Sequence, residues 1–177
     1  AYHDYATTEE IQAEREAARA DGKPFVYSNY VTSIDGRIAV ARPDDSGMEV
    51  PGNTANDRDW RLFQELAAQA DLLITSARYF RQSEDSEAQA ELPVGLSTEF
   101  DDLRAWRIQQ GLSPQPDIAV FSASLDVPVS AINRYGDRKV FLITGSAADS
   151  EKLGQITAAS HTRVIHCGHH GHVDASL

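Results

Sequence analysis

Four short apolar runs recur along this chain with helix-length segments between them, and this alternation most constrains its fold. The runs are rich in β-branched and aromatic residues, which suit buried strands. They cover residues 71–75, 117–122, 139–144 and 162–166. Strands that alternate with helices form parallel crossover units, because parallel neighbours cannot be joined by a tight turn. The sequence therefore predicts an α/β fold, a three-layer sandwich around a mostly parallel central sheet.

The segments between these runs carry helix signals. Residues 56–69 place Trp60, Phe63 and Leu66 on one apolar face, which predicts a helix. A second helix is predicted from Thr98 to Gly111 and a third over residues 147–159. Residues 81–97 are polar and lack periodicity, so we expect a surface loop there.

The amino-terminal part of the chain predicts a helical extension over residues 1–23, followed by one domain over residues 24–177. Thr7 and Glu10 have capping-box spacing, and Gly22 suits a helix end. A length of 177 residues is enough for a single sizeable core. The chain begins without methionine and stops at residues 174–177, where the sequence predicts the start of a helix, so we expect both ends to be cut and the carboxyl-terminal part of the domain to be missing.

Residues 25–39, FVYSNYVTSIDGRIA, predict a buried strand that runs into a polar turn. The strand is expected over residues 25–32, and the turn is Ser33-Ile34-Asp35-Gly36, because Asp-Gly tolerates tight turns. A short strand should restart at Arg37, before a polar loop over residues 41–53.

The predicted carboxyl ends of the strands are candidate ligand sites, because open α/β sheets bind ligands at that edge. The ends are residues 32–36, 75–79, 122–125 and 144–146, and each is rich in small hydroxyl residues or glycine. Such residues let a ligand approach the backbone and offer hydrogen bonds without bulk.

Three segments resemble a known family. The pattern Ser-x-Asp-Gly-[Lys/Arg]-x-Ala is matched by Ser33, Asp35, Gly36, Arg37 and Ala39, and residues 56–74 and 103–126 are similar to later segments. The chain thus resembles, over residues 24–177, the reductase domain of bacterial riboflavin biosynthesis, which belongs to the dihydrofolate-reductase-like superfamily.

The resemblance implies a function and a set of site residues. It implies an NADPH-dependent homodimer resembling 5-amino-6-(5-phosphoribosylamino)uracil reductase, which transfers hydride to a ribosylamino-pyrimidine. Asp35 would be catalytic, and Asp35 and Asn53 would lie near the substrate. The implied cofactor contacts are Val31, Thr32, Ser33, Thr75, Ser76, Tyr79, Ser83, Ser124 and Thr144.

The sequence also departs from the family pattern, which leaves other functions open. Residues 75–79 replace the Gly-x-Gly-Thr turn that the family pattern predicts. Ser83 stands where the family has an aspartate after that turn, and Ala67 stands where it has a phosphate-binding arginine. A Gly-Gly phosphate loop is absent before Leu177. The alternatives are a non-catalytic ligand-binding relative, or a reductase of another small substrate such as a pterin.

Composition excludes several other classes of function. The net charge of -11 argues against a nucleic-acid or anionic-membrane surface, which needs basic residues, but it does not exclude a phosphorylated small molecule as the partner. No apolar run of about 18 residues is present, so we expect no membrane span. The single cysteine, Cys167, fits a reducing cytoplasm.

Histidines cluster over residues 166–172, but no paired cysteines or distant carboxylate accompany them, and we expect no metal site.

Overall fold

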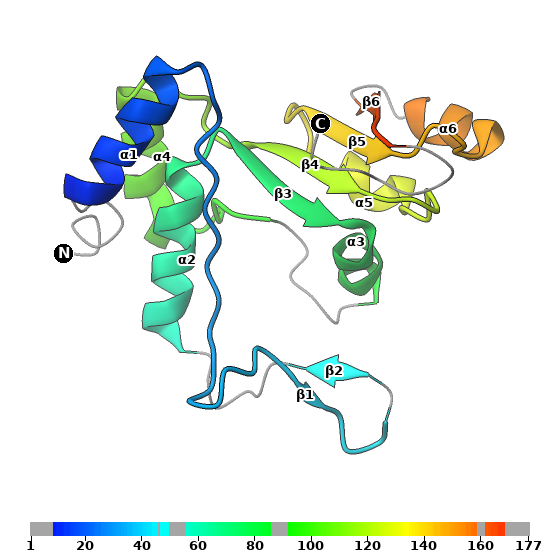
Figure 1. Cartoon of the computed structure of the whole chain (residues 1–177), viewed down its shortest axis with the longest axis horizontal. Coiled ribbons are helices and arrows are strands. Elements are labelled where there is room, and N and C mark those ends of the chain that lie inside the picture. Colours follow the sequence, from blue (N-terminus) through cyan, green and yellow to red (C-terminus); the bar gives the residue numbers. More distant parts are fainter. Residues whose placement is uncertain (1–8, 46, 50–55, 86–91, 159–161, 169–177) are drawn as a thin grey trace. The chain divides into compact units, whose positions relative to one another are not determined.

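The computed structural model describes residues 9–45, 47–49, 56–85, 92–158 and 162–168 of the 177-residue chain. The chain forms two compact units, Ala1–Leu66 and Ala67–Leu177. Figure 1 labels the helices and strands of both units. No helix among the described residues is both long and apolar enough to cross a membrane.

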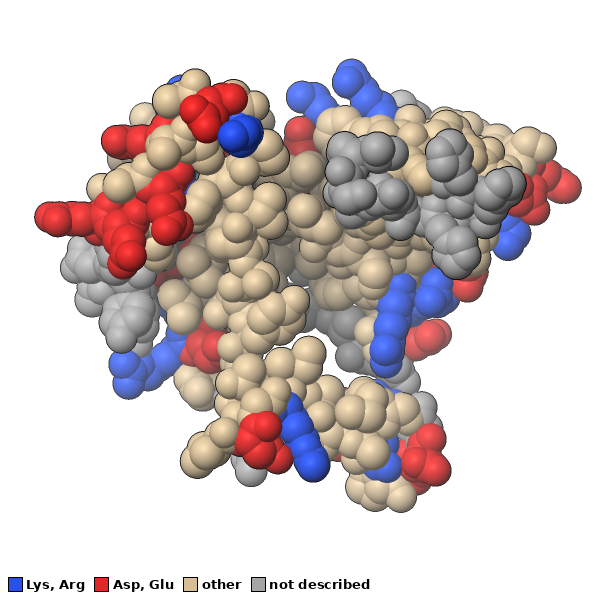
Figure 2. Space-filling view, viewed as in Figure 1, with Lys and Arg blue, Asp and Glu red and all other residues tan. Residues whose placement is uncertain are grey.

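The first unit contains α1 (Glu9–Ala20), β1 (Val40–Ala41), β2 (Met48–Glu49) and most of α2 (Asp57–Gln69). The predicted amino-terminal helix is present, although Thr7 lies outside the described residues. No residue of α1 is buried, and Figure 2 shows its acidic side chains gathered on the surface. Gly22, with φ of 66°, allows the chain to turn after the helix, where the Lys23 amide donates to the Ala18 carbonyl at 2.8 Å.

The strand predicted over residues 25–32 is wrong: this segment belongs to neither sheet of the structure. A strand requires ladder hydrogen bonds to a neighbour, and apolar composition alone does not supply that neighbour. Val26 and Tyr30 are accordingly 69% and 66% exposed. The restarted strand begins at Val40 rather than Arg37, and β1 pairs with β2 in an antiparallel hairpin inside the expected polar loop.

The second unit is built on a parallel sheet whose strands match the four predicted runs. These strands are β3 (Leu72–Ser76), β4 (Asp117–Phe121), β5 (Val140–Thr144) and β6 (Thr162–His166), in the spatial order β3-β4-β5-β6. All three neighbouring pairs are parallel. The predicted parallel α/β architecture is therefore confirmed, and all four strands end at the same edge of the sheet.

Helices α3 (Ala77–Glu84), α5 (Val129–Asn133) and α6 (Ser150–Thr157) pack on one face of this sheet. The unit also contains η1 (Thr98–Phe100) and α4 (Asp101–Gln109). Phe80 of α3, Ile132 of α5 and Ile156 of α6 share one buried cluster with Ile118, Val120, Val140 and Leu142 of the sheet. The predicted second and third helices are present with shorter bounds. The sequence does not predict α5, because five residues are too few to show helical periodicity.

The surface loop predicted over residues 81–97 is wrong at both ends. Helix α3 continues to Glu84, and Leu92, Pro93 and Val94 are buried. Arg138 holds the buried stretch by donating to the carbonyls of Leu92 at 3.0 Å and Pro93 at 3.3 Å. A three-residue apolar stretch beside polar sequence carries too weak a pattern to predict this burial.

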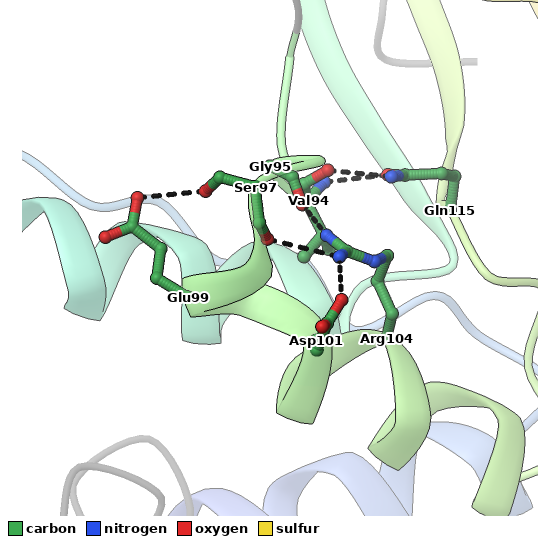
Figure 3. Close-up of polar contacts among 7 residues, drawn as sticks. All are labelled: Val94, Gly95, Ser97, Glu99, Asp101, Arg104 and Gln115. Atoms are coloured by element: carbon green, nitrogen blue, oxygen red, sulfur yellow. Dashed lines mark hydrogen bonds and ion pairs between the residues drawn. The ribbon is translucent and has the colours of Figure 1, made fainter.

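Side chains also fix residues 94–97 (Figure 3). Gln115 accepts from the Val94 amide at 2.8 Å and donates to the Val94 carbonyl at 2.7 Å, so its side-chain amide imitates a strand neighbour. Arg104 of α4 donates to the Gly95 carbonyl and, at 3.1 Å, to the Ser97 carbonyl. These contacts order the chain before α4.

Arg107 joins the end of α2 to the turn after α4. Its side chain is 1% exposed. It donates to the carbonyls of Ala68, Ala70 and Ser113, each at 2.7 Å. A guanidinium group can satisfy several carbonyls at once because its donors form a rigid fork.

Candidate functional site

The carboxyl edge of the parallel sheet gathers small polar residues. Ser76 ends β3, Thr144 ends β5, His166 ends β6, and Ser122 directly follows β4. Ligands of open α/β sheets bind outside this edge, because the loops that leave the strands converge there. We therefore take this edge as the candidate functional site.

Two buried hydroxyl groups mark the middle of the edge. Phe121 and Ile143 are partners in the β4–β5 register, so the next residues, Ser122 and Thr144, are neighbours on one face. They are 5% and 0% exposed. Among the described residues, neither the Ser122 Oγ nor the Thr144 Oγ1 has a hydrogen-bond partner. Such groups are rare in native proteins, and a bound ligand is one explanation for them.

The helices that leave the edge differ in how their first turns are capped. Helix α3 follows β3 with no intervening loop, and no side chain caps its first amides, while its first turn contains no acid. In α6 the Asp149 carboxylate accepts from the amides of Glu151 at 2.9 Å and Lys152 at 3.2 Å. The first turn of α3 can therefore receive a ligand's anionic group, whereas that of α6 already holds a carboxylate.

The loop after β4 exposes Ser124 and buries the side chain of Leu125. Its carbonyls accept from two cations. Arg81 donates to the Asp126 carbonyl at 2.7 Å, and Lys152 donates to the Ser124 carbonyl at 3.3 Å. The loop is thus held in one path beside the two buried hydroxyls.

The ends of β5 and β6 are tied to each other. The Cys167 amide donates to the Thr144 carbonyl at 2.8 Å, and the His166 Nδ1 lies 3.3 Å from the Gly145 carbonyl. Within the described part of the chain, no group of three or more His, Cys, Asp or Glu residues could hold a metal ion. The remaining histidines of the predicted tract, from His169 onward, lie outside the described residues.

Comparison with known proteins gives the family. The model of the RibD C-terminal domain matches residues 24–176. The chain belongs to the RibD C-terminal domain family. This confirms the resemblance to the reductase domain of riboflavin biosynthesis that the sequence motifs indicated.

A solved structure shares the fold of this RibD C-terminal domain. It is the crystal structure of a pyrimidine reductase-like protein from Corynebacterium diphtheriae, with 18% identity and a TM-score of 0.56. The match covers 78% of this chain and 53% of that one, so the chain spans about half the length of the solved protein. The likeness shows a dihydrofolate-reductase-like α/β fold. No curated protein matches the chain significantly.

The family's Ser-x-Asp-Gly turn lies in the first unit and is formed as predicted. The Gly36 amide donates to the Ser33 carbonyl at 2.9 Å, with a φ of 82° at Gly36. Ser33 donates to the Asp35 carboxylate, whose other oxygen lies 3.2 Å from the Arg37 guanidinium. Asp35 and Thr32 are exposed, and Val31 is half-buried. The turn presents a carboxylate held by two neighbours of its own motif.

Four of the remaining predicted contacts lie in β3 and α3. Thr75 and Ser76 lie at the end of β3, and Tyr79 is half-buried against the core cluster. Ser83 is buried within α3, where its hydroxyl donates to the Phe80 carbonyl at 2.8 Å. Asn53 lies outside the described residues.

The sequence predicted residues 122–125 as a ligand-binding strand end, and the family resemblance selected Ser124 rather than Ser122 within it. The signal was present, because strand residues alternate between faces. Ile118 and Val120 face the helix-covered core, so Ser122, two residues further, faces the same side. Arg81 and Lys152 were missed because their contacts span 45 and 28 residues of sequence.

A pocket of about 400 Å³ lies at the opposite, amino-terminal ends of β4 and β5. Three cations line it, Arg134, Arg138 and Lys139. Each has a partner within the protein. Arg134 pairs with Glu84, Lys139 lies 3.8 Å from Asp117, and Arg138 donates to the Pro116 carbonyl at 2.8 Å. Because these charges are already matched, the carboxyl edge is the better candidate site.

Proposed function

We propose that this RibD C-terminal domain is an NADPH-dependent reductase that acts on a ribosylamino-pyrimidine at the carboxyl edge of its sheet. The observation that carries the proposal is the pair of buried hydroxyls, Ser122 and Thr144, with no described hydrogen-bond partner. An unsatisfied buried hydroxyl costs about 1–3 kcal/mol, and a bound nucleotide would offset that cost. Family membership and the shared fold support the reductase class.

The residues at this edge fit a nicotinamide nucleotide. Ser76 and Ser124 are exposed hydroxyl residues that leave room for the cofactor, and Ser122 and Thr144 add further hydroxyl groups at the same edge of the sheet. The uncapped first turn of α3 offers backbone amides to phosphate oxygens. When bound, the cofactor would supply the hydride that opens the ribose to a ribityl chain. The protein would orient the reactants, and Asp35 would supply the polar group that handles the proton.

A second candidate function is a non-catalytic ligand-binding relative of the family. Two observations favour it. Ser83, which replaces a family aspartate, is buried with its hydroxyl bonded inside α3, and the first turn of α6 is capped by Asp149. Both reduce the number of groups that could contact a nucleotide.

The test is a titration of the purified chain with NADPH, followed by the change in nicotinamide fluorescence. We expect saturable binding below millimolar cofactor, and its absence would contradict the reductase. Turnover is then measured with the ribosylamino-pyrimidine and with dihydrofolate. Oxidation of NADPH with the ribosylamino-pyrimidine would support the proposal. Oxidation with dihydrofolate alone would indicate a pterin reductase. Binding of NADPH without turnover of either substrate would indicate the non-catalytic relative.

The proposal includes a homodimeric assembly and a cytoplasmic location. The family resemblance implies a homodimer, and light scattering after size-exclusion chromatography would measure its mass. A cytoplasmic location is consistent with the single cysteine of the chain, because a reducing compartment does not favour disulfides. Fractionation of the source cells would test that location.

A further inference from the structure

The loop between β4 and α5, residues 122–128, is anchored from both sides by cations. Arg81 of α3 donates to the Asp126 carbonyl at 2.7 Å and lies 3.4 Å from its carboxylate. Lys152 of α6 donates to the Ser124 carbonyl at 3.3 Å. Figure 1 shows that α3 continues from the end of β3 and that α6 lies beyond β5. Since β3 and β5 are the two neighbours of β4, the loop is tied to the helices that follow both neighbouring strands.

The backbone of this loop has a shape that needs such anchors. Leu125 adopts a φ of 57°, in the left-handed region that side-chain-bearing residues rarely occupy. Its side chain is 3% exposed, and the Val127 amide donates to the Leu125 carbonyl at 2.9 Å. The preceding residue, Ser124, is exposed. Lys152 binds the carbonyl before Leu125 and Arg81 binds the carbonyl after it, so the two cations fix the path of the backbone itself.

The geometry points to Arg81 and Lys152 as positioning residues for the nicotinamide nucleotide, an inference that rests on the proposed function. They hold residues 122–128 so that Ser122 and Ser124 stay in place at the carboxyl edge. Neither cation needs to contact the ligand. Each acts through a loop carbonyl, and the loss of either anchor releases the same loop.

The experiment compares Arg81→Met and Lys152→Met, which keep most of the side-chain length but remove the charge and the donors. Lys139→Met is the matched control, because Lys139 is an exposed cation at the opposite end of the sheet. Two quantities are measured on the full chain, the hydrogen exchange of amides 123–127 and the dissociation constant of NADPH. The melting temperature reports any general loss of structure.

In both variants we expect faster exchange in the loop and a three- to tenfold higher dissociation constant, with a melting temperature like that of Lys139→Met. Arg81→Lys and Lys152→Arg should restore most of the affinity. The double variant should weaken binding less than the product of the two single effects, because both anchors hold one loop.

Several results would overturn the inference. Exchange at residues 123–127 equal to that of the wild type excludes the anchoring role, whatever the affinity does. Faster exchange with unchanged NADPH affinity excludes the positioning role. If the wild type does not bind NADPH at all, the proposed function and the ligand part of this inference both fail, while the exchange rates still decide whether the two cations anchor the loop.

Discussion

Ser122 and Thr144 are side by side at the carboxyl ends of β4 and β5, and both carry a buried hydroxyl with no partner among the described residues. A structure that keeps such groups without a ligand is less stable than one in which apolar groups of the same shape replace them. Stability of the ligand-free chain and ligand binding therefore make opposite demands on these two hydroxyls.

Thr144→Val should raise the free energy of unfolding of the ligand-free chain by about 1 kcal/mol and weaken NADPH binding by about tenfold. Ser122→Ala should weaken binding similarly. Thr162→Val is the control, because the Thr162 Oγ1 is also buried without a described partner but lies at the amino end of β6. It should change stability and leave binding unaltered. Denaturation in urea and fluorescence titration measure the two effects, and weaker stability of Thr144→Val would contradict the account.

Asp35→Asn should lower kcat by about a hundredfold or more while leaving NADPH affinity nearly unchanged, because proton handling contributes on this scale. The exposed Asp35–Arg37 pair, 3.2 Å apart, should contribute less than about 1 kcal/mol to stability. Asp21→Asn is the matched control, since Asp21 also pairs with a cation two residues later, Lys23, at 3.1 Å. Steady-state kinetics provide the test, and a kcat equal to that of the control would remove Asp35 from catalysis.

The sequence predicted the elements whose pattern is local. The four strands of the second unit were found because each is a run of apolar residues between helical segments, and α2 was found from its apolar face. Residues 25–32 carry an equally good strand pattern but lack a ladder partner in the structure. Pairing depends on residues far away in the chain, which composition does not specify.

The candidate site was predictable as an edge but not as a set of contacts. The predicted strand ends located the carboxyl edge of the sheet, and Thr75, Ser76 and Thr144 do lie there. Ser83 was carried over from a family position, and its hydroxyl is instead bonded inside α3. The anchors of the β4–α5 loop depend on which helices flank β4, and strand order is a property of the folded sheet.

Arg107→Met should destabilise the chain by about 3 kcal/mol or more. The substitution leaves the carbonyls of Ala68, Ala70 and Ser113 without their buried donor, and each unsatisfied acceptor costs about 1–3 kcal/mol. Arg107→Lys should recover only part of the loss, because one ammonium cannot reproduce the guanidinium fork. Urea denaturation measures both, with Arg19→Met on exposed α1 as control. A loss below about 1 kcal/mol for Arg107→Met would show that water replaces the arginine.

Two glycines should respond to alanine with opposite signs. A Cβ at Gly95 would lie 2.5 Å from the buried Phe100 ring, so Gly95→Ala should destabilise the chain by about 1–3 kcal/mol. Gly154 lies within α6 with nothing near its Cβ position, so Gly154→Ala should stabilise by about 0.5–1 kcal/mol through helix propensity. Thermal and urea denaturation of both variants provide the test, and Phe100→Leu should relieve the Gly95→Ala defect when the two are combined. A neutral Gly95→Ala would mean that the ring moves aside freely, which contradicts the tight packing of Phe100 before α4.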